Sequence, residues 1–224
     1  MAVNTLLQLR TQVRQRANME NSQFVTDAEL NSYINLAIAE LYDLMVSKYG
    51  EDYFFTSYDL PLQIATEAYT LPTDFYKLLG VDLMIDATRK IRLRRFEFAE
   101  RNRVDYALTL REIDLRYRLR GNTIIFSPIT NVSQRTIRIS YIPRYVYLGG
   151  DTDTFDGYNG WEEYVIVRAA IKCLMKEESD VSALAQELML LEKRIEAMAD
   201  NRDAQSPTRV YDNNTIWEFY DIWP

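Results

Sequence analysis

The sequence has no histidine, one cysteine and only 7 glycines among its 224 residues. Histidine is the commonest general base and metal ligand, so its absence excludes every histidine-dependent triad and zinc site. The lone Cys173 cannot form an internal disulfide, and the fold therefore does not depend on an oxidising compartment. Its apolar neighbours Ile171, Leu174 and Met175 predict a buried structural thiol rather than a nucleophile.

Long apolar runs and phosphate-binding glycine loops are also missing. No stretch of about 18 apolar residues occurs, so we expect no membrane span and no membrane partner. Residues 1–5 lack the basic and apolar regions of a signal peptide, which predicts a protein made and used in a cytoplasm. Neither G-x-G-x-x-G nor G-x-x-x-x-G-K-[ST] is present. We therefore expect no cofactor and no enzymatic activity.

The composition that remains is that of a soluble globular protein. Hydrophobic residues make up 47% and charged residues 26%, enough for a real core in one domain or one domain with an insertion. The formal net charge of -7 argues against a general nucleic-acid-binding protein but leaves room for a local basic patch. The 16 tyrosines fit either contact surface at interfaces or a tyrosine-rich sheet.

Helical spacing predicts two helices at each end of the chain. The first is expected over residues 5–17, and the second starts at a capping box formed by Thr26 and Glu29 and stops at Gly50. A third helix begins at Trp161, and the last follows Asp180 as a plausible N-cap. The last helix carries a heptad seam from Val181 to Met198, which suits antiparallel packing.

The middle of the chain has the short, β-branched and aromatic segments of a sheet. Strands are expected at residues 54–60, 68–71, 78–85, 89–95, 115–120, 123–127 and 136–142. Gly121-Asn122 predicts a two-residue hairpin turn between two of them. Residues 95–104 indicate a short helix on this sheet, and residues 144–160 a loop.

These segments predict an α+β fold. An antiparallel bundle of about four helices, two N-terminal and two C-terminal, would carry an inserted β-rich subdomain and an extended C-terminal arm. The expected boundaries are residues 1–52 and 149–201 for the bundle helices, 53–148 for the insertion and 202–224 for the arm.

The arm has no periodicity but is rich in aromatic side chains. Folding back on its own core is one reading, yet the chain has enough apolar surface for a core without it. Since aromatic anchors dominate interface energetics at about 2 kcal/mol or more each, we favour docking on another subunit or another protein. The candidate docking residues are Tyr211, Ile216, Trp217, Phe219, Tyr220, Ile222 and Trp223.

Residues 89–120 form a basic patch. At strand spacing, Arg116, Arg118 and Arg120 share one face. A nucleic-acid surface is one interpretation. Interleaved acids such as Glu97 and Glu112, and the acidic chain as a whole, favour a charged face between subunits. The candidate residues of that face are Arg92, Arg94, Arg116, Arg118 and Arg120.

Three carboxylates in the 144–160 loop resemble part of a calcium loop. Asp151, Asp153 and Asp156 have the spacing of oxygen ligands, but no bidentate glutamate follows at the twelfth position. A solvated connection that uses turn-forming aspartates is the favoured alternative, so no metal site is predicted.

Both ends of the chain resemble one protein family. The segments VRQRA at 13–17, FVTDAELNSYIN at 24–35 and AELYDL at 39–44 resemble the N-terminal part of head-to-tail adaptor (connector) proteins of tailed bacteriophages. The second half of the chain is similar to the same family in the segments FDG at 155–157, WEEY at 161–164, AAIK at 169–172, KEESD at 176–180 and NRDA at 201–204. The resemblance is close at the helical ends and loose in the insertion.

The resemblance implies a virion structural protein at the head–tail junction, assembled in the host bacterial cytoplasm. Such proteins form a ring, commonly twelvefold, below the portal, through which double-stranded DNA passes without sequence-specific binding. The ring extends the channel, helps to seal the packaged genome and offers a platform for tail or nozzle proteins. The alternative hypothesis is a nucleic-acid-binding module that uses the arginine-rich strands at 89–120.

Overall fold

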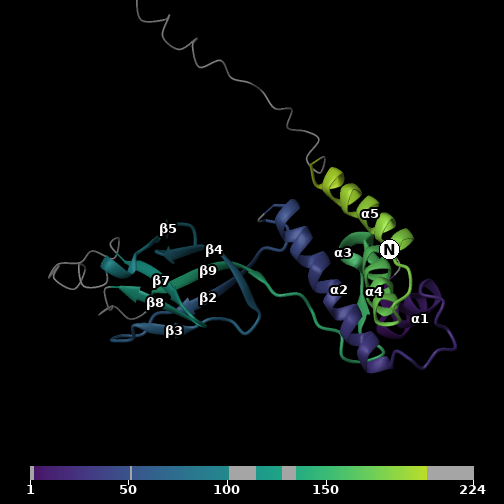
Figure 1. The fold of residues 1–224 in the computed structure, drawn as a ribbon. Helices are drawn as coiled ribbons and strands as arrows, with labels where there is room; N and C mark the ends of the chain where they lie inside the picture. Colours follow the sequence, from purple (N-terminus) through teal and green to yellow (C-terminus); the bar gives the residue numbers. More distant parts are fainter. Residues whose placement is uncertain (1–2, 51, 101–114, 128–134, 201–224) are drawn as a thin grey trace, which may run out of the picture.

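The structure, a computed structural model, describes residues 3–50, 52–100, 115–127 and 135–200. It is a mixed α+β protein in which the helices and most strands lie in two groups (Figure 1). We call the first group the helical unit. It contains α1 (Leu6–Arg16), α2 (Asp27–Lys48), α3 (Gly157–Gly160), α4 (Glu162–Lys176), α5 (Ser182–Asp200), β1 (Asn4–Thr5) and β10 (Thr154–Phe155).

Capping side chains define where the first two long helices begin. The capping box at the start of α2 is confirmed, because Thr26 accepts from the backbone of Glu29 and Glu29 accepts from the backbone of Thr26. A second box, Thr5 with Gln8, starts α1. Helix α2 ends at Lys48 with Tyr49 as its C-cap, and Gly50 follows with a φ of 89°, a conformation that glycine adopts without strain.

The four long helices share one hydrophobic cluster. Helix α2 packs on α4, and α4 also packs on α1 and α5. Of the predicted seam of α5, Leu188 and Ile195 are buried and Val181, Leu184 and Leu191 pack partly against the cluster. Met198 is 55% exposed, so the seam ends one step earlier than predicted.

The loop expected over residues 144–160 contains two elements that the sequence analysis did not predict. Its β10 pairs antiparallel with β1, placing Asn4 opposite Phe155, and α3 follows directly. Both elements are very short, and a two-residue strand has too few positions to show an alternating pattern. The pairing holds the start of the chain beside the entry to α4.

The second group, the β unit, is built from two four-stranded sheets. The first has the order β2-β9-β4-β5 and the second β3-β8-β7-β6. The strands are β2 (Thr56–Pro61), β3 (Ala68–Thr70), β4 (Phe75–Met84), β5 (Lys90–Arg92), β6 (Arg94–Arg95), β7 (Arg116–Arg120), β8 (Thr123–Ser127) and β9 (Thr136–Pro143), with the 3-10 turn η1 (Phe98–Glu100).

A separate hydrophobic cluster joins the two sheets. Val81 and Ile139 from the first sheet and Phe126 from the second are each almost fully buried in it. The hairpin turn predicted at Gly121-Asn122 connects β7 and β8, with Gly121 at a φ of 56°. Both sheets contribute side chains to this core, because successive residues of a strand point to opposite faces of its sheet.

The single strand expected over 89–95 is split between the sheets. Strand β5 pairs with β4 in the first sheet, whereas β6 pairs in parallel with β7 in the second. Leu93 lies between them, buried in the cluster, and its N–H donates to the carbonyl of Val81 at 2.8 Å. The predicted helix over 95–104 is only the 3-10 turn η1 as far as residue 100, and its remainder lies outside the described residues.

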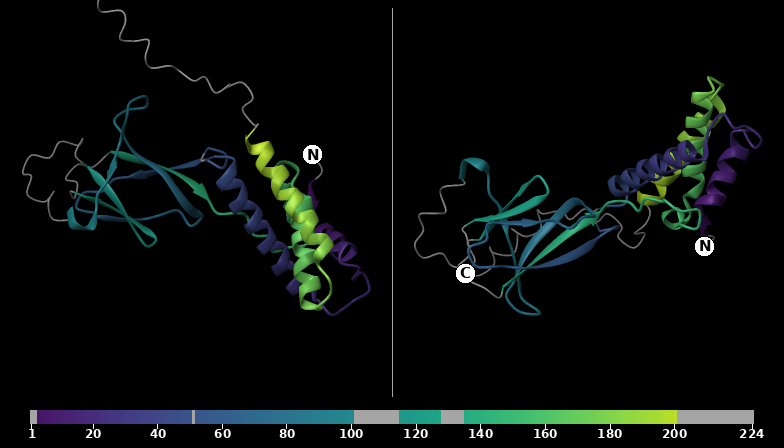
Figure 2. Two further views of the ribbon diagram at one scale, coloured as in Figure 1. Left: turned by 45° about the horizontal axis from the view of Figure 1, so that its top comes forward. Right: turned by 90° about the horizontal axis from the view of Figure 1, so that it is seen from below.

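The β unit extends to one side of the helical unit (Figures 1 and 2). The chain enters it after α2 and returns to the helical unit after β9. Within the described part of the chain, no helix is both long and apolar enough to cross a membrane.

Candidate protein-docking surfaces

A cluster of aromatic rings lies where the two units meet. The ring of Tyr42 on α2 lies 4.5 Å from that of Phe54, 5.5 Å from Tyr158 and 6.1 Å from Tyr76 on β4. Its hydroxyl donates to the carbonyl of Pro143 at the end of β9. Burial raises the pKa of the Tyr42 hydroxyl well above its usual value. Tyr42 therefore contacts the segments by which the chain both enters and leaves the β unit.

A buried amide fixes the returning segment beside α2. The Asn35 side chain donates to the carbonyl of Leu148 at 3.0 Å and accepts from the N–H of Leu148 at 2.8 Å. A second link runs from the hydroxyl of Tyr76 to Asp43 at 2.7 Å. Sequence reasoning missed this junction, although aromatic residues packed around the end of the second helix were a visible signal.

The predicted arginines do not all share one face. Tyr117 and Leu119 on β7 pack toward the core, so Arg116, Arg118 and Arg120 lie on the outer face of the second sheet, as their spacing predicts. Arg94 on β6 is in register with Arg116. Arg92 belongs to β5 in the first sheet, so it lies apart from the other four.

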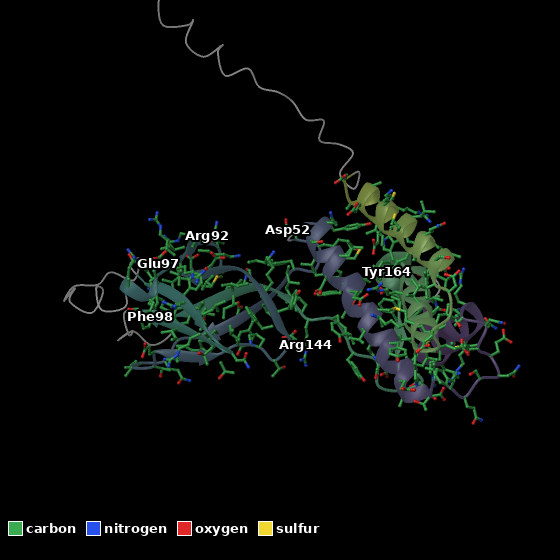
Figure 3. The ribbon with its side chains drawn as sticks, viewed as in Figure 1. Asp52, Arg92, Glu97, Phe98, Arg144 and Tyr164 are labelled. Carbon is green, nitrogen blue, oxygen red and sulfur yellow. The ribbon has the colours of Figure 1, made fainter. Side chains whose placement is uncertain are left out.

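A hollow of about 450 Å³ lies on this outer face. It is lined by Arg95, Glu97, Phe98 and Arg118, which we call the arginine hollow. The guanidinium of Arg118 lies 5.1 Å from the centre of the Phe98 ring, and its buried Nη1 has no hydrogen-bond partner among the described residues. Glu97 and Phe98 lie at the end of the β unit away from the helices (Figure 3).

Opposite charges alternate across the outer face of the first sheet. Asp59, Arg138, Asp82 and Arg92 occupy successive register positions on β2, β9, β4 and β5. Arg138 donates to both carboxylate oxygens of Asp59 at 2.7 Å, which lowers the pKa of Asp59 and raises that of Arg138. This charge row is negative at the β2 edge and positive at the β5 edge.

Helix α5 carries three exposed large apolar side chains. Met189 and Leu190 are 56% and 67% exposed, and Met198 lies further along the same helix. Side chains of this size are costly to leave in water, and exposed apolar groups gathered on one element are typical of interaction surfaces.

Each of the three aspartates of the 144–160 loop has a partner within the protein. Asp151 pairs with Arg10 of α1, whose buried guanidinium also lies 3.4 Å from Asp27. Asp153 accepts from the N–H groups of Gly149 and Gly150, both at 2.8 Å, and these bonds lower its pKa. Asp156 accepts from the N–H of Tyr158. The geometry thus favours the connecting-loop interpretation over a calcium site.

Cys173 is buried in α4, as predicted. Burial raises the pKa of its thiol to about 11, so very little thiolate is present near neutral pH. This environment suits a packing residue rather than a nucleophile.

The predicted arm lies outside the described residues, so Tyr211, Ile216, Trp217, Phe219, Tyr220, Ile222 and Trp223 are not placed. The family model described as "SU10 adaptor protein" matches residues 4–211. That span includes the helical unit, the β unit and the first part of the segment after α5. The comparison with curated proteins found no match.

Proposed function

The chain belongs to the SU10 adaptor protein family, and this membership indicates a structural role in the phage virion. We propose that the chain forms a ring below the portal of the capsid. The ring, commonly twelvefold in such proteins, would extend the DNA channel and offer a platform for tail or nozzle proteins. The observation that carries this proposal is the family match over residues 4–211.

A closed ring needs two different, complementary side surfaces on each subunit. The charge row supports this requirement, because its Asp59 end and its Arg92 end carry opposite charges at opposite edges of one sheet. The exposed Met189 and Leu190 of α5 add a second contact area. We propose that both lie between neighbouring subunits.

We further propose that residues 1–52 and 149–201 form an antiparallel bundle that stacks around the channel, with residues 53–148 as an inserted domain. The two separate hydrophobic clusters support this division. An acidic channel wall would repel DNA phosphates and let the duplex slide. Calculating the electrostatic potential of an assembled ring tests this, and a basic lumen would contradict it.

The arm, residues 202–224, is proposed to dock on the portal or on a neighbouring subunit. Electron microscopy of the protein mixed with purified capsid portals tests the assembly, with a ring on the portal as the expected result. Deleting residues 215–224 should leave a folded protein that no longer docks. A large drop in melting temperature would instead place the arm in the protein's own core.

The second candidate function is binding of nucleic acid by the arginine-rich strands. The observation in its favour is that the guanidinium of Arg118 on β7 lies beside the ring of Phe98 in a hollow that Arg95 also lines. Against it, Arg116 lies 3.5 Å from Glu100, and Glu97 lines the same hollow. Salt-dependent DNA binding by the isolated protein would support this function, and no binding at low salt would eliminate it.

A further inference from the structure

The arginine hollow has the chemistry of a receptor for an acidic, aromatic segment. Arg95 and Arg118 supply two guanidinium groups, and Phe98 is 62% exposed beside them. Guanidinium groups bind carboxylates well, and the exposed part of the phenyl ring adds apolar contact surface beside them. The hollow therefore fits a carboxylate flanked by aromatic side chains.

The chain itself contains such a segment. Residues 217–221 read Trp-Glu-Phe-Tyr-Asp, so Glu218 and Asp221 alternate with three aromatic side chains. We propose that this segment of the arm of one subunit binds in the arginine hollow of a second copy. The inference rests on the proposed docking role of the arm and names the partner of that arm.

Charge favours a protein segment over a nucleic acid as the occupant. Glu97 lies in the lining and Glu100 pairs with Arg116, so the basic surface is confined to a small area. A duplex carries closely spaced phosphates along its whole length and is bound by broad basic surfaces. Two carboxylates within five residues match the small size of the hollow better.

Reach and position favour a second copy as the donor. An extended chain from Asp200 to Trp217 spans at most about 55–60 Å, about twice the diameter of a small domain. Glu97 and Phe98 of the hollow lie at the end of the β unit away from the helices (Figure 3), whereas the arm follows α5 of the helical unit in the chain. A contact between copies would leave each subunit with one arm and one hollow in use, as ring closure requires.

A complementation experiment with full-length chains tests this inference. One variant carries Glu218→Lys and Asp221→Lys in its arm, and the other carries Arg118→Glu in its hollow. Each alone should lose self-association measured by energy transfer between labelled copies, while the mixture should recover it through one intact arm and one intact hollow. Placing all three substitutions in one chain should also restore association, because the charges are swapped as a pair.

Arg144→Glu is the control with the same change of charge, since Arg144 is exposed, lies outside the arginine-rich strands and does not line the hollow. It should change association less than about threefold, against at least about tenfold for Arg118→Glu. Circular dichroism checks that Arg118→Glu is folded, and the triple variant provides an independent readout.

Several outcomes would overturn the inference. They are unchanged association of the arm variant, a mixture that fails to associate, or a triple variant that is not rescued. Loss of salt-dependent DNA binding in Arg118→Glu without loss of association would assign the hollow to nucleic acid instead. If these results occur while the wild-type protein still forms a ring on portals, the adaptor function stands and only the arm's partner is wrong.

Discussion

The helical unit and the β unit use their charged side chains in different ways. In the helical unit, ion pairs join separate helices: Glu40 of α2 binds both Arg168 and Lys172 of α4, and Lys176 of α4 binds Glu29 of α2. In the β unit, the charge row and the arginine hollow lie on outer faces of the sheets. Both units contain ion pairs between elements, but only in the β unit do charged side chains also line a hollow.

Burial explains part of this difference. Burial of Glu40 would raise its pKa, but the hydrogen bonds from Arg168 and Lys172 outweigh that effect and lower the pKa. Charged groups that are partly withdrawn from water need such partners. Exposed pairs like Asp59 with Arg138 contribute less stability, so their surface can serve recognition at little energetic cost.

The largest expected effects come from a matched pair of core substitutions. Ile38→Ala in the helical unit and Ile139→Ala in the β unit each remove a fully buried side chain, which should cost about 2–5 kcal/mol of unfolding free energy. If the two clusters are separate, Ile38→Ala should reduce hydrogen-exchange protection in α2 and α4 while β9 keeps its protection, and Ile139→Ala should do the reverse. Equal loss in both units would mean that they unfold together.

Asn35→Ala should have the next largest effect. It leaves the buried N–H and carbonyl of Leu148 without their side-chain partner, at an expected cost of about 1–3 kcal/mol. Chemical denaturation measures the loss, and hydrogen exchange at Leu148 should rise more than elsewhere. Asn31→Ala on the same helix is the control, because the bond from Asn35 goes to the backbone of Asn31. An equal loss in the control would contradict a specific role for the Asn35 amide.

Tyr42→Phe tests how strongly the junction couples the two units. The ring contacts remain, and only the hydrogen bond to Pro143 is lost, so the expected cost is about 1 kcal/mol. The unfolding of the two units, followed by hydrogen exchange in α2 and β9, should become less concerted. Tyr76→Phe is a fitting comparison because Tyr76 is 48% exposed, and its effect should be smaller.

The smallest effects concern acid. The pKa values of Glu40, Glu29 and Asp59 are lowered in the folded protein. The ion pairs of these carboxylates therefore stabilise the fold above the unfolded-state pKa. This contribution is lost as the pH falls through the folded-state pKa, below about pH 4. Glu40→Gln should flatten the decline of melting temperature in acid more than Asp59→Asn does. The reverse order would show that the charge row carries more of the stability than the helix-joining pairs.

Local patterns predicted many elements well. Strand 123–127 and the capping box of Thr26 and Glu29 occur where expected, because side-chain alternation and capping depend on near neighbours in the chain. Asp180 was one residue too early as an N-cap: α5 begins at Ser182, and Asp180 accepts from its N–H. The switch of sheets at Leu93 left no local signal. Strand β5 pairs with β4, which precedes it directly in the chain, but β6 pairs with β7, which follows only after residues 101–114.

The candidate sites were predictable only in part. The outward face of Arg116, Arg118 and Arg120 followed from strand spacing, whereas the hollow required η1 to fold back beside β7. The partners of Asp151 and Asn35 are likewise more than 100 residues distant. Periodicity carries no information about such distant contacts.

By itself, the sequence determined the α+β class, most element positions and the exclusion of histidine-based chemistry, since these follow from composition and local spacing. Only the tertiary structure decided the pairing of charges across the first sheet, the aromatic junction at Tyr42 and the arginine hollow. Each of these depends on strand register and on contacts between distant segments, which local periodicity does not specify.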